Sequence, residues 1–180
     1  MKRLRYHVAV SLDGFIAGPK GEYDWIVMDP SVDFTALFKQ FDTAVMGRKT
    51  FEAVLAQGTG GEMPGLKVIV FSRTLRAADY PKVTITNHDP VATVRKLKSD
   101  EGKDVWLFGG GALFRTLADA GLVDTVELGV MPVLLGQGIP LVPPGRAIKH
   151  LRLLEHKALP SGIVMLKYAT GGAKGSSDAD

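Results

Sequence analysis

Short runs of β-branched and apolar residues, each bounded by turn residues, recur along the chain and predict eight buried strands. The predicted strands are Tyr6–Leu12, Thr43–Met46, Lys67–Phe71, Val83–Thr86, Val105–Phe108, Thr125–Val130, His150–Lys157 and Gly162–Tyr168.

Helical patterns lie between the early strands. Apolar residues at i, i+3, i+4 and i+7 mark the first helix, and Asp89 as N-cap with Pro90 at the first helical position marks the third. Alternation of strand and helix up to Val130 predicts a mainly parallel sheet covered on both faces. The helical segments are the face Phe34, Leu37, Phe38 and Phe41, then Thr50–Ala56, the stretch after Asp89, and Ala112–Ala120.

The last two predicted strands have no helix between them. The turn Leu159-Pro160-Ser161-Gly162 joins them, so they are expected to form a hairpin that adds an antiparallel edge to the sheet. We therefore expect an α/β fold with a central eight-stranded, mainly parallel sheet. Residues 1–169 are expected to form a single domain, and residues 170–180 a disordered C-terminal tail, because the tail has no side chain able to anchor it in a core.

Composition narrows the possible chemistry. The 180 residues include no cysteine, which excludes a thiol nucleophile, a disulfide scaffold and a Cys-ligated zinc site, and we expect no metal. The net charge is +3, with 22 Lys and Arg against 19 Asp and Glu interleaved along the chain, so nucleic acid is not expected as a partner. The longest apolar runs are too short to cross a membrane, and no export signal follows the basic start, so a cytoplasmic protein is expected.

Three loops carry candidate chemistry, because each follows a predicted parallel strand, and ligands of open α/β sheets bind beyond the carboxyl ends of strands. In the first loop, Gly47 precedes Arg48, Lys49 and Thr50 at the opening of a helix. Backbone N–H groups, helix dipole and side-chain charge would converge there on an anion. The alternative is a solvated turn with Thr50 as the N-cap of the helix.

The second loop, Ser72-Arg73-Thr74, places a cation between two hydroxyls at the end of a strand, although an ordinary exposed turn would have the same composition. The third loop places Gly109, Gly110 and Gly111 between a strand and a helix. Three glycines in succession suggest that something approaches the main chain closely, and a pyrophosphate at the helix N-terminus is the usual occupant. The motif matches neither a Rossmann fingerprint nor a P-loop.

Together the three loops describe a site for a dinucleotide with an additional phosphate. Arg48, with Lys49 or Arg73, would distinguish NADPH from NADH by charge pairing and hydrogen bonding. The sequence therefore predicts NADPH as the cofactor.

Four motifs in the same order resemble the dihydrofolate-reductase-like superfamily over nearly the whole chain to about Tyr168. They are VAVSLDGFIA at 8–17, MGRKTFE at 46–52, VFSRT at 70–74 and FGGGALF at 108–114. The segment SLDG at 11–14 and PVLLGQGIPL at 132–141 look most like the branch that contains the C-terminal reductase domain of the riboflavin-biosynthesis deaminase/reductase. The resemblance implies a dihydrofolate-reductase-like fold and NADPH.

The resemblance also implies roles for individual residues. Gly47, Arg48, Lys49 and Thr50 would lie at the cofactor phosphates, and Ser72, Arg73 and Thr74 around the adenosine phosphate. The turn formed by Gly109, Gly110, Gly111, Ala112 and Leu113 would lie against the pyrophosphate, and the backbone at Ala9 and Val10 would hold the nicotinamide amide.

The substrate side departs from both relatives. Asp33 is the match for the acidic residue of folate reductases, but it lies one residue out of their spacing to Phe38, and Gly129 replaces their strand threonine. Asp33 is therefore either the catalytic carboxylate or the N-cap of the first helix, and the shifted spacing favours the cap. Asp13 is either at the substrate mouth or in a turn, and Trp25 either walls the pocket or packs. All four histidines are interpreted as structural or exposed.

These observations predict an NADPH-dependent reductase of a small heterocyclic substrate, most like 5-amino-6-(5-phosphoribosylamino)uracil reductase. Its substrate pocket is expected to include Asp13, Trp25 and Phe38. The alternatives are dihydrofolate reduction and an NADPH-binding protein without turnover. The resemblance implies a homodimer, to which the apolar stretch Val130–Val142 would contribute.

Overall fold

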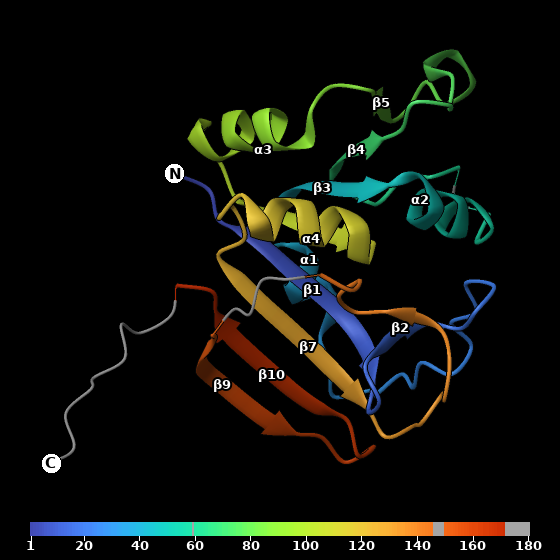
Figure 1. The fold of residues 1–180 in the computed structure, drawn as a ribbon, viewed down its shortest axis with the longest axis vertical. Helices are drawn as coiled ribbons and strands as arrows, with labels where there is room; N and C mark the ends of the chain where they lie inside the picture. Colours follow the sequence, from blue (N-terminus) through green and yellow to red (C-terminus); the bar gives the residue numbers. More distant parts are fainter. Residues whose placement is uncertain (59, 146–149, 172–180) are drawn as a thin grey trace, which may run out of the picture.

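A central eight-stranded sheet organises the chain (Figure 1). The computed structural model describes residues 1–58, 60–145 and 150–171. The strands lie in the order β5-β4-β3-β6-β1-β7-β10-β9 and run parallel as far as β7, while β10 is antiparallel to both β7 and β9. Their bounds are β1 Leu4–Ser11, β3 Phe41–Gly47, β4 Lys67–Phe71, β5 Thr84–Thr86, β6 Asp104–Gly109, β7 Thr125–Met131, β9 Arg152–Ala158 and β10 Val164–Ala169. The predicted α/β fold, with its mainly parallel sheet and C-terminal antiparallel hairpin, is confirmed.

Two very short strands were not predicted. The strands β2 (Phe15–Ala17) and β8 (Ile139–Pro140) pair antiparallel in a small second sheet. This pairing brings the segment after β1 against the loop after β7. Three and two residues are too few for an alternating pattern to be recognised in the sequence.

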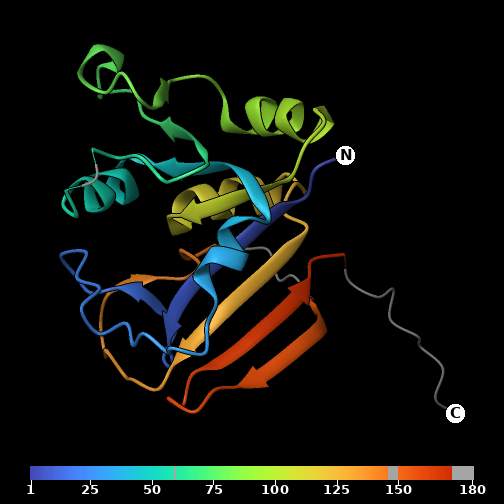
Figure 2. The same ribbon diagram turned by 180° about the vertical axis from the view of Figure 1, so that it is seen from behind.

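Helices cover both faces of the main sheet (Figures 1 and 2). The helices α3 (Pro90–Ser99) and α4 (Gly111–Asp119) bury Val94, Leu113 and Leu117 against one face. On the other face, α1 (Phe34–Phe38) and α2 (Arg48–Leu55) pack with Trp106 and other strand side chains. A 3₁₀ turn spans Ala77–Asp79. None of the described helices could span a membrane, and the longest α-helix has 10 residues.

Local start and stop signals explain where the helices differ from expectation. Helix α1 ends at Phe38, and Phe41 instead opens β3, where it is 2% exposed and stacks on Trp106 at 5.1 Å. The apolar i+7 position of the predicted helix therefore belongs to the next strand. Helix α3 begins as predicted, because the Asp89 carboxylate accepts hydrogen bonds from the first-turn N–H groups.

The end of the predicted domain is held by hydrogen bonds from Thr170 to the backbone just before β7. The backbone N–H of Thr170 donates to the carbonyl oxygen of Asp124 at 3.1 Å, and its hydroxyl donates to the carbonyl oxygen of Val123. Of the tail expected from residue 170 onward, residues 172–180 lie outside the described residues, so its disorder stays a prediction.

Candidate active site

The three predicted ligand-binding loops lie at one edge of the sheet. Strand β3 lies between β4 and β6, with Gly47 in register with Phe71 and Met46 in register with Gly109. Because all three strands are parallel, the loops that follow them leave from the same edge. The structure thus brings together the glycine-cation loop, the Ser-Arg-Thr loop and the triple-glycine turn.

Two helices at this edge begin without a side-chain cap. The N-caps of α2 and α4 are Gly47 and Gly110, neither of which has a side chain to accept from the first-turn N–H groups. The helices α1 and α3, by contrast, are capped by the carboxylates of Asp33 and Asp89. The predicted capping role of Thr50 is therefore wrong, since α2 begins two residues earlier at Arg48. The uncapped N–H groups of α2 and α4 remain available to an anion.

Different structural constraints apply at the three consecutive glycines. Gly109 has φ +150°, and a Cβ there would lie 3.1 Å from the Thr50 hydroxyl. At Gly111 a Cβ would lie 2.8 Å from the carbonyl oxygen of Pro140, so the chain itself packs against this position. Gly110 has φ −96°, and a Cβ there would meet only the Thr50 hydroxyl, at 3.3 Å. The Gly109–Gly110 peptide bond is cis. Open space therefore remains beside Gly110, at the N-terminus of α4.

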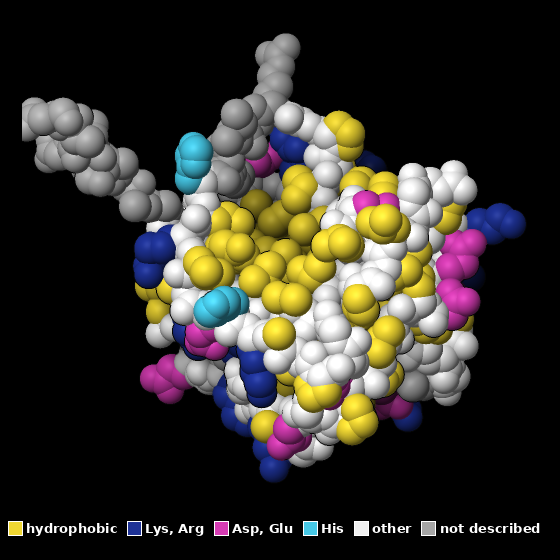
Figure 3. All heavy atoms as spheres, turned by 90° about the horizontal axis from the view of Figure 1, so that it is seen from below, with side chains coloured by type: hydrophobic (Ala, Val, Ile, Leu, Met, Phe, Trp, Pro, Cys, Tyr) yellow, Lys and Arg dark blue, Asp and Glu magenta, His cyan; other side chains and the backbone are white. Residues whose placement is uncertain are grey.

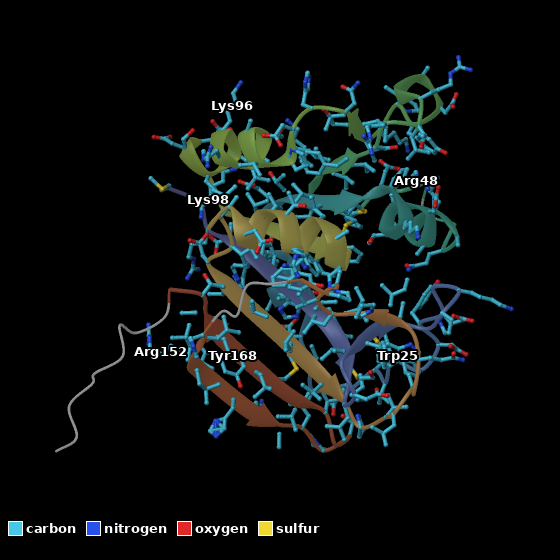
Figure 4. The ribbon with its side chains drawn as sticks, viewed as in Figure 1. Trp25, Arg48, Lys96, Lys98, Arg152 and Tyr168 are labelled. Carbon is cyan, nitrogen blue, oxygen red and sulfur yellow. The ribbon has the colours of Figure 1, made fainter. Side chains whose placement is uncertain are left out.

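Positively charged side chains surround this edge. Arg48, at the start of α2 (Figure 4), is half-exposed and forms an ion pair with Glu52 at 3.3 Å. Lys49 and Arg73 are exposed, and neither has an ion-pair partner among residues 1–58, 60–145 and 150–171. The Ser72 hydroxyl accepts the backbone N–H groups of Thr74 and Leu75 at 3.2 and 3.0 Å. Ser72 thus shapes the turn that presents Arg73.

A gap opens in the sheet beside this edge. The pairing of β1 with β6 stops at Tyr6–Leu107, whereas β1 continues to Ser11 and stays paired with β7 as far as Met131. Beyond that point the indole Nε1 of Trp106 donates to the carbonyl oxygen of His7 at 2.9 Å. Since backbone groups alternate along a strand, the polar groups of Ala9 also face this gap.

Two of the candidate substrate residues flank the gap, Phe38 beside β6 and Trp25 beside the end of β7. Phe38 of α1 packs edge-on against Trp106, with 5.2 Å between ring centroids. Trp25 and Ala9 pack against the same small cluster, which is built on Met131, Leu159 and Ile163. Trp25 also donates its indole N–H to the carbonyl oxygen of Glu22 at 3.0 Å, and Figure 4 shows its position. An apolar cover thus lies over the carboxyl half of β1.

Two acidic residues that were candidates from the sequence both accept hydrogen bonds from backbone N–H groups. The Asp33 carboxylate is exposed and accepts the Ala36 N–H at 2.9 Å, as expected of an N-cap. The Asp13 carboxylate accepts the Ser11 hydroxyl at 2.6 Å and the N–H groups of Leu135 and Gly136 at 3.1 and 2.7 Å. The Ser11 hydroxyl, together with these N–H groups, lowers the pKa of Asp13. Asp13 therefore joins the turn after β1 to the loop after β7.

Sequence reasoning missed two groups near the site. Asp29 is buried and accepts the N–H of Ser31 at 2.8 Å and of Ser161 at 3.1 Å, which joins the segment before α1 to the β9–β10 turn. His7 lies on the same face of β1 as Ala9 and contacts buried Glu127. The available signal was the spacing of two between His7 and Ala9, which places both side chains on one face of a strand.

No group of three or more His, Asp or Glu that could hold a metal occurs in the described part of the chain. A split parallel sheet whose loops gather uncapped helix starts and cations at one edge is the architecture of dihydrofolate-reductase-like proteins. The comparisons with known proteins agree. The model of the RibD C-terminal domain family matches residues 2–165, so the chain belongs to this family.

Individual relatives support the same assignment. The uncharacterised protein YyaP of Bacillus subtilis (strain 168) is 37% identical over an alignment of 182 residues. The alignment covers 95% of this chain and 96% of YyaP. A putative riboflavin biosynthesis protein from Shewanella sp. PV-4 superposes with a TM-score of 0.78 at 26% identity, covering 94% of this chain and 98% of that one. Dihydrofolate reductase from Enterococcus faecalis, complexed with NADP(H), shares the fold with a TM-score of 0.70 at 17% identity, covering 94% and 97%.

Proposed function

We propose that this protein is an NADPH-dependent reductase of a small heterocyclic substrate, most like the reductase that acts on 5-amino-6-(5-phosphoribosylamino)uracil. The observation that carries the proposal is the meeting of two uncapped helix starts with exposed cations beside a gap in the sheet. Membership in the RibD C-terminal domain family supports a reductase-like protein.

The residues at the edge fit a dinucleotide phosphate. The first-turn N–H groups of α2 and α4 would hold the phosphates, and the open side of Gly110 leaves room for their approach. Arg48 and Arg73 would pair with the additional phosphate that distinguishes NADPH from NADH. The backbone groups of Ala9 that face the gap would bind the nicotinamide amide. Bound there, NADPH would supply a hydride.

The substrate would lie under the cover formed by Trp25 and Phe38, where water is excluded and the acceptor atom is aligned. Dihydrofolate reduction is the less favoured alternative. Asp33 is an exposed cap, and Gly129 offers no hydroxyl where folate reductases place a threonine. The third possibility is an NADPH-binding protein without turnover.

The deciding experiment combines the full chain and NADPH with a panel of acceptors. The panel contains 5-amino-6-(5-phosphoribosylamino)uracil, 7,8-dihydrofolate and 7,8-dihydrobiopterin, and NADPH consumption is followed by absorbance. We expect the aminopyrimidine to be reduced and NADH to be a poor donor. Consumption of dihydrofolate alone would favour the second activity. Tight NADPH binding with none of the panel reduced would contradict the proposal.

A homodimer is part of the proposal. The edge strand β9 is exposed along its length. Four apolar residues on or beside it are 37–48% exposed, namely Leu151, Leu153, Leu154 and Val164. Figure 3 shows hydrophobic side chains gathered on the face of the molecule seen from below. An apolar area beside a free strand suits a second copy of the chain related by a two-fold axis.

Light scattering on the full chain tests this interface. We expect a dimer mass at micromolar concentration, and a monomer for Leu153→Glu. The matched control is Lys157→Glu on the same strand, where a polar residue already stands, and this variant should remain dimeric. A monomer mass for the unaltered chain would contradict the interface.

A further inference from the structure

We propose that His7 is the proton donor of the reduction and that Glu127 is the residue that positions it. The inference rests on the proposed function and adds the group that supplies the proton. His7 was interpreted from the sequence as structural or exposed, so its position in the fold is what changes its interpretation.

His7 lies beside the place assigned to the nicotinamide. It precedes Ala9 by two residues on the same face of β1, a distance of about 7 Å along a strand. It is also the first β1 residue beyond the last β1–β6 register pair, Tyr6–Leu107, so it lies where the gap begins. The next residues on this face are covered by the cluster that contains Trp25. A substrate under that cover would lie within reach of the His7 ring.

The imidazole is held at one nitrogen only. Its Nδ1 lies 3.3 Å from Oε2 of Glu127, and the ring packs edge-on against Trp106 with 5.9 Å between centroids. Among the residues that the structure describes, Nε2 has no hydrogen-bond partner. The His7 side chain is 18% exposed, whereas its neighbour Tyr6 is completely buried. One nitrogen is therefore fixed and the other is free to meet a ligand.

Glu127 is kept ionised by its surroundings. Burial alone would raise the pKa of its carboxyl, but hydrogen bonds from His7, Arg5 and Thr125 and the charge of Arg5 outweigh burial and lower the pKa. The Arg5 guanidinium makes a two-pronged contact with Glu127 at 2.8 and 2.6 Å, and the Thr125 hydroxyl donates at 2.7 Å. An ionised carboxylate only accepts hydrogen bonds, so His7 must donate from Nδ1, which fixes the ring orientation.

The other charged groups around His7 are paired with carboxylates. Arg5, on the same face of β1, also contacts Asp104 at 3.4 Å. Lys167 of β10 is the register partner of Glu127 and pairs with Glu155 at 3.1 Å. Trp106 of β6 is uncharged. His7 is thus the group at this end of the gap that combines a free nitrogen with a fixed orientation.

The proton balance of the reaction indicates the role of Nε2, which is to donate a proton to the substrate. Reduction of a C=N or C=O bond adds a hydride to carbon, for which NADPH is the proposed source, and a proton to the heteroatom. The Nε2–H bond of protonated His7 breaks as the new N–H or O–H bond forms on the substrate. The imidazole is left neutral and takes its next proton from water. Glu127 stabilises the protonated ring throughout without giving up its own charge.

The test compares the unaltered full chain with His7→Gln, which removes the transferable proton, and with a matched control, His156→Gln on the exposed edge strand β9. The acceptor is the panel compound that the unaltered chain reduces most rapidly. We expect His7→Gln to lower kcat by roughly 10²- to 10⁴-fold. NADPH affinity and melting temperature should change little, and His156→Gln should behave like the unaltered chain. A kcat within about threefold of the unaltered chain would overturn the proposal.

Two further readouts separate a proton donor from a structural histidine. The rate with the unaltered chain should fall when H₂O is replaced by D₂O, because the transferred proton becomes a deuteron, and this isotope effect should be absent in His7→Gln. Independently of turnover, the ¹⁵N signals of the His7 ring in the unaltered chain should show that Nδ1 carries the proton of the hydrogen bond to Glu127. A ring in which Nδ1 carries no proton would overturn the proposal. Failure of the proposed function is seen separately, in the NADPH binding and consumption of the unaltered chain.

Discussion

Replacing Gly110 by alanine should damage cofactor binding while leaving the fold intact, whereas the same change at Gly111 should do the reverse. At Gly110 the backbone has φ −96°, and the added Cβ would lie 3.3 Å from the Thr50 hydroxyl and otherwise in open space. At Gly111 the added Cβ would lie 2.8 Å from the carbonyl oxygen of Pro140 and 3.1 Å from that of Leu141. Both carbonyls are backbone atoms, which cannot rotate away.

The expected magnitudes follow from these contacts. Overpacking against backbone costs about 1–3 kcal/mol, which for a domain of this size lowers the melting temperature of Gly111→Ala by roughly 2–12 °C. Gly110→Ala exchanges one residue without a side-chain cap for another and should cost at most about 1 kcal/mol. In the site, its methyl group would displace a phosphate from the N–H groups of α4. Loss of one charged hydrogen bond, about 1.5–3 kcal/mol, lowers NADPH affinity roughly 10- to 150-fold.

The assay pairs NADPH titration, followed by tryptophan fluorescence, with thermal melting followed by circular dichroism. Gly111→Ala serves as the matched control for a methyl group added to the same turn. If Gly110→Ala bound NADPH as tightly as the unaltered chain, the space beside Gly110 would not be a phosphate site. If Gly111→Ala melted at the unaltered temperature, the packing argument would be wrong.

Three further predictions concern single side chains. Arg48→Ala or Arg73→Ala should weaken NADPH by about 1.5–3 kcal/mol in titrations and leave NADH nearly unchanged, and equal losses would place that arginine at the pyrophosphate instead. Asp33→Asn should keep turnover and melting temperature while Asp33→Ala loses roughly 1 kcal/mol of stability, and a stable but inactive Asp33→Asn would contradict the capping role. The ionised form of Glu127 stabilises the fold above about pH 4.5, and this contribution is lost as pH falls through its lowered pKa. Melting temperatures of the unaltered chain should therefore fall more steeply below that pH than those of Glu127→Gln, and parallel curves would refute the linkage.

Most strands of the main sheet could be predicted because they are short runs rich in apolar and β-branched residues between turn residues. The prediction that all eight are buried is wrong for β9, which lies at the edge of the sheet and is exposed at every residue. The start of α3 at Asp89–Pro90 could also be predicted, because helix capping depends on residues that are close in sequence. The end of α1 could not be predicted in this way. Phe41 fits the helical period of α1, but it is the first residue of β3 and pairs with β6. That pairing joins positions about 60 residues apart, beyond the reach of a local pattern.

The candidate site shows the same division between local and distant causes. The loops at Gly47, Ser72 and Gly109 were recognised because each follows a strand, and the parallel sheet then places them at one edge. The role of Asp13 was not recognised, because its partners Leu135 and Gly136 lie more than 120 residues later. The significance of His7 likewise depends on Glu127, on a strand that only the fold brings beside β1.

The gap between β1 and β6 beyond Tyr6–Leu107 has a mechanical consequence. One side of the sheet, β5 to β6, bears the three candidate ligand-binding loops, and the other, β1 to β9, carries Ala9 and the cluster that contains Trp25. Within the sheet these two halves share only the register pairs Leu4–Val105 to Tyr6–Leu107, at the end away from the loops. A small rotation about this short joint would change the distance between the three loops and the Ala9 backbone, the two places to which the proposed cofactor would bind. Substitutions at the joint should therefore weaken NADPH binding more than they weaken the binding of a ligand held by one half alone.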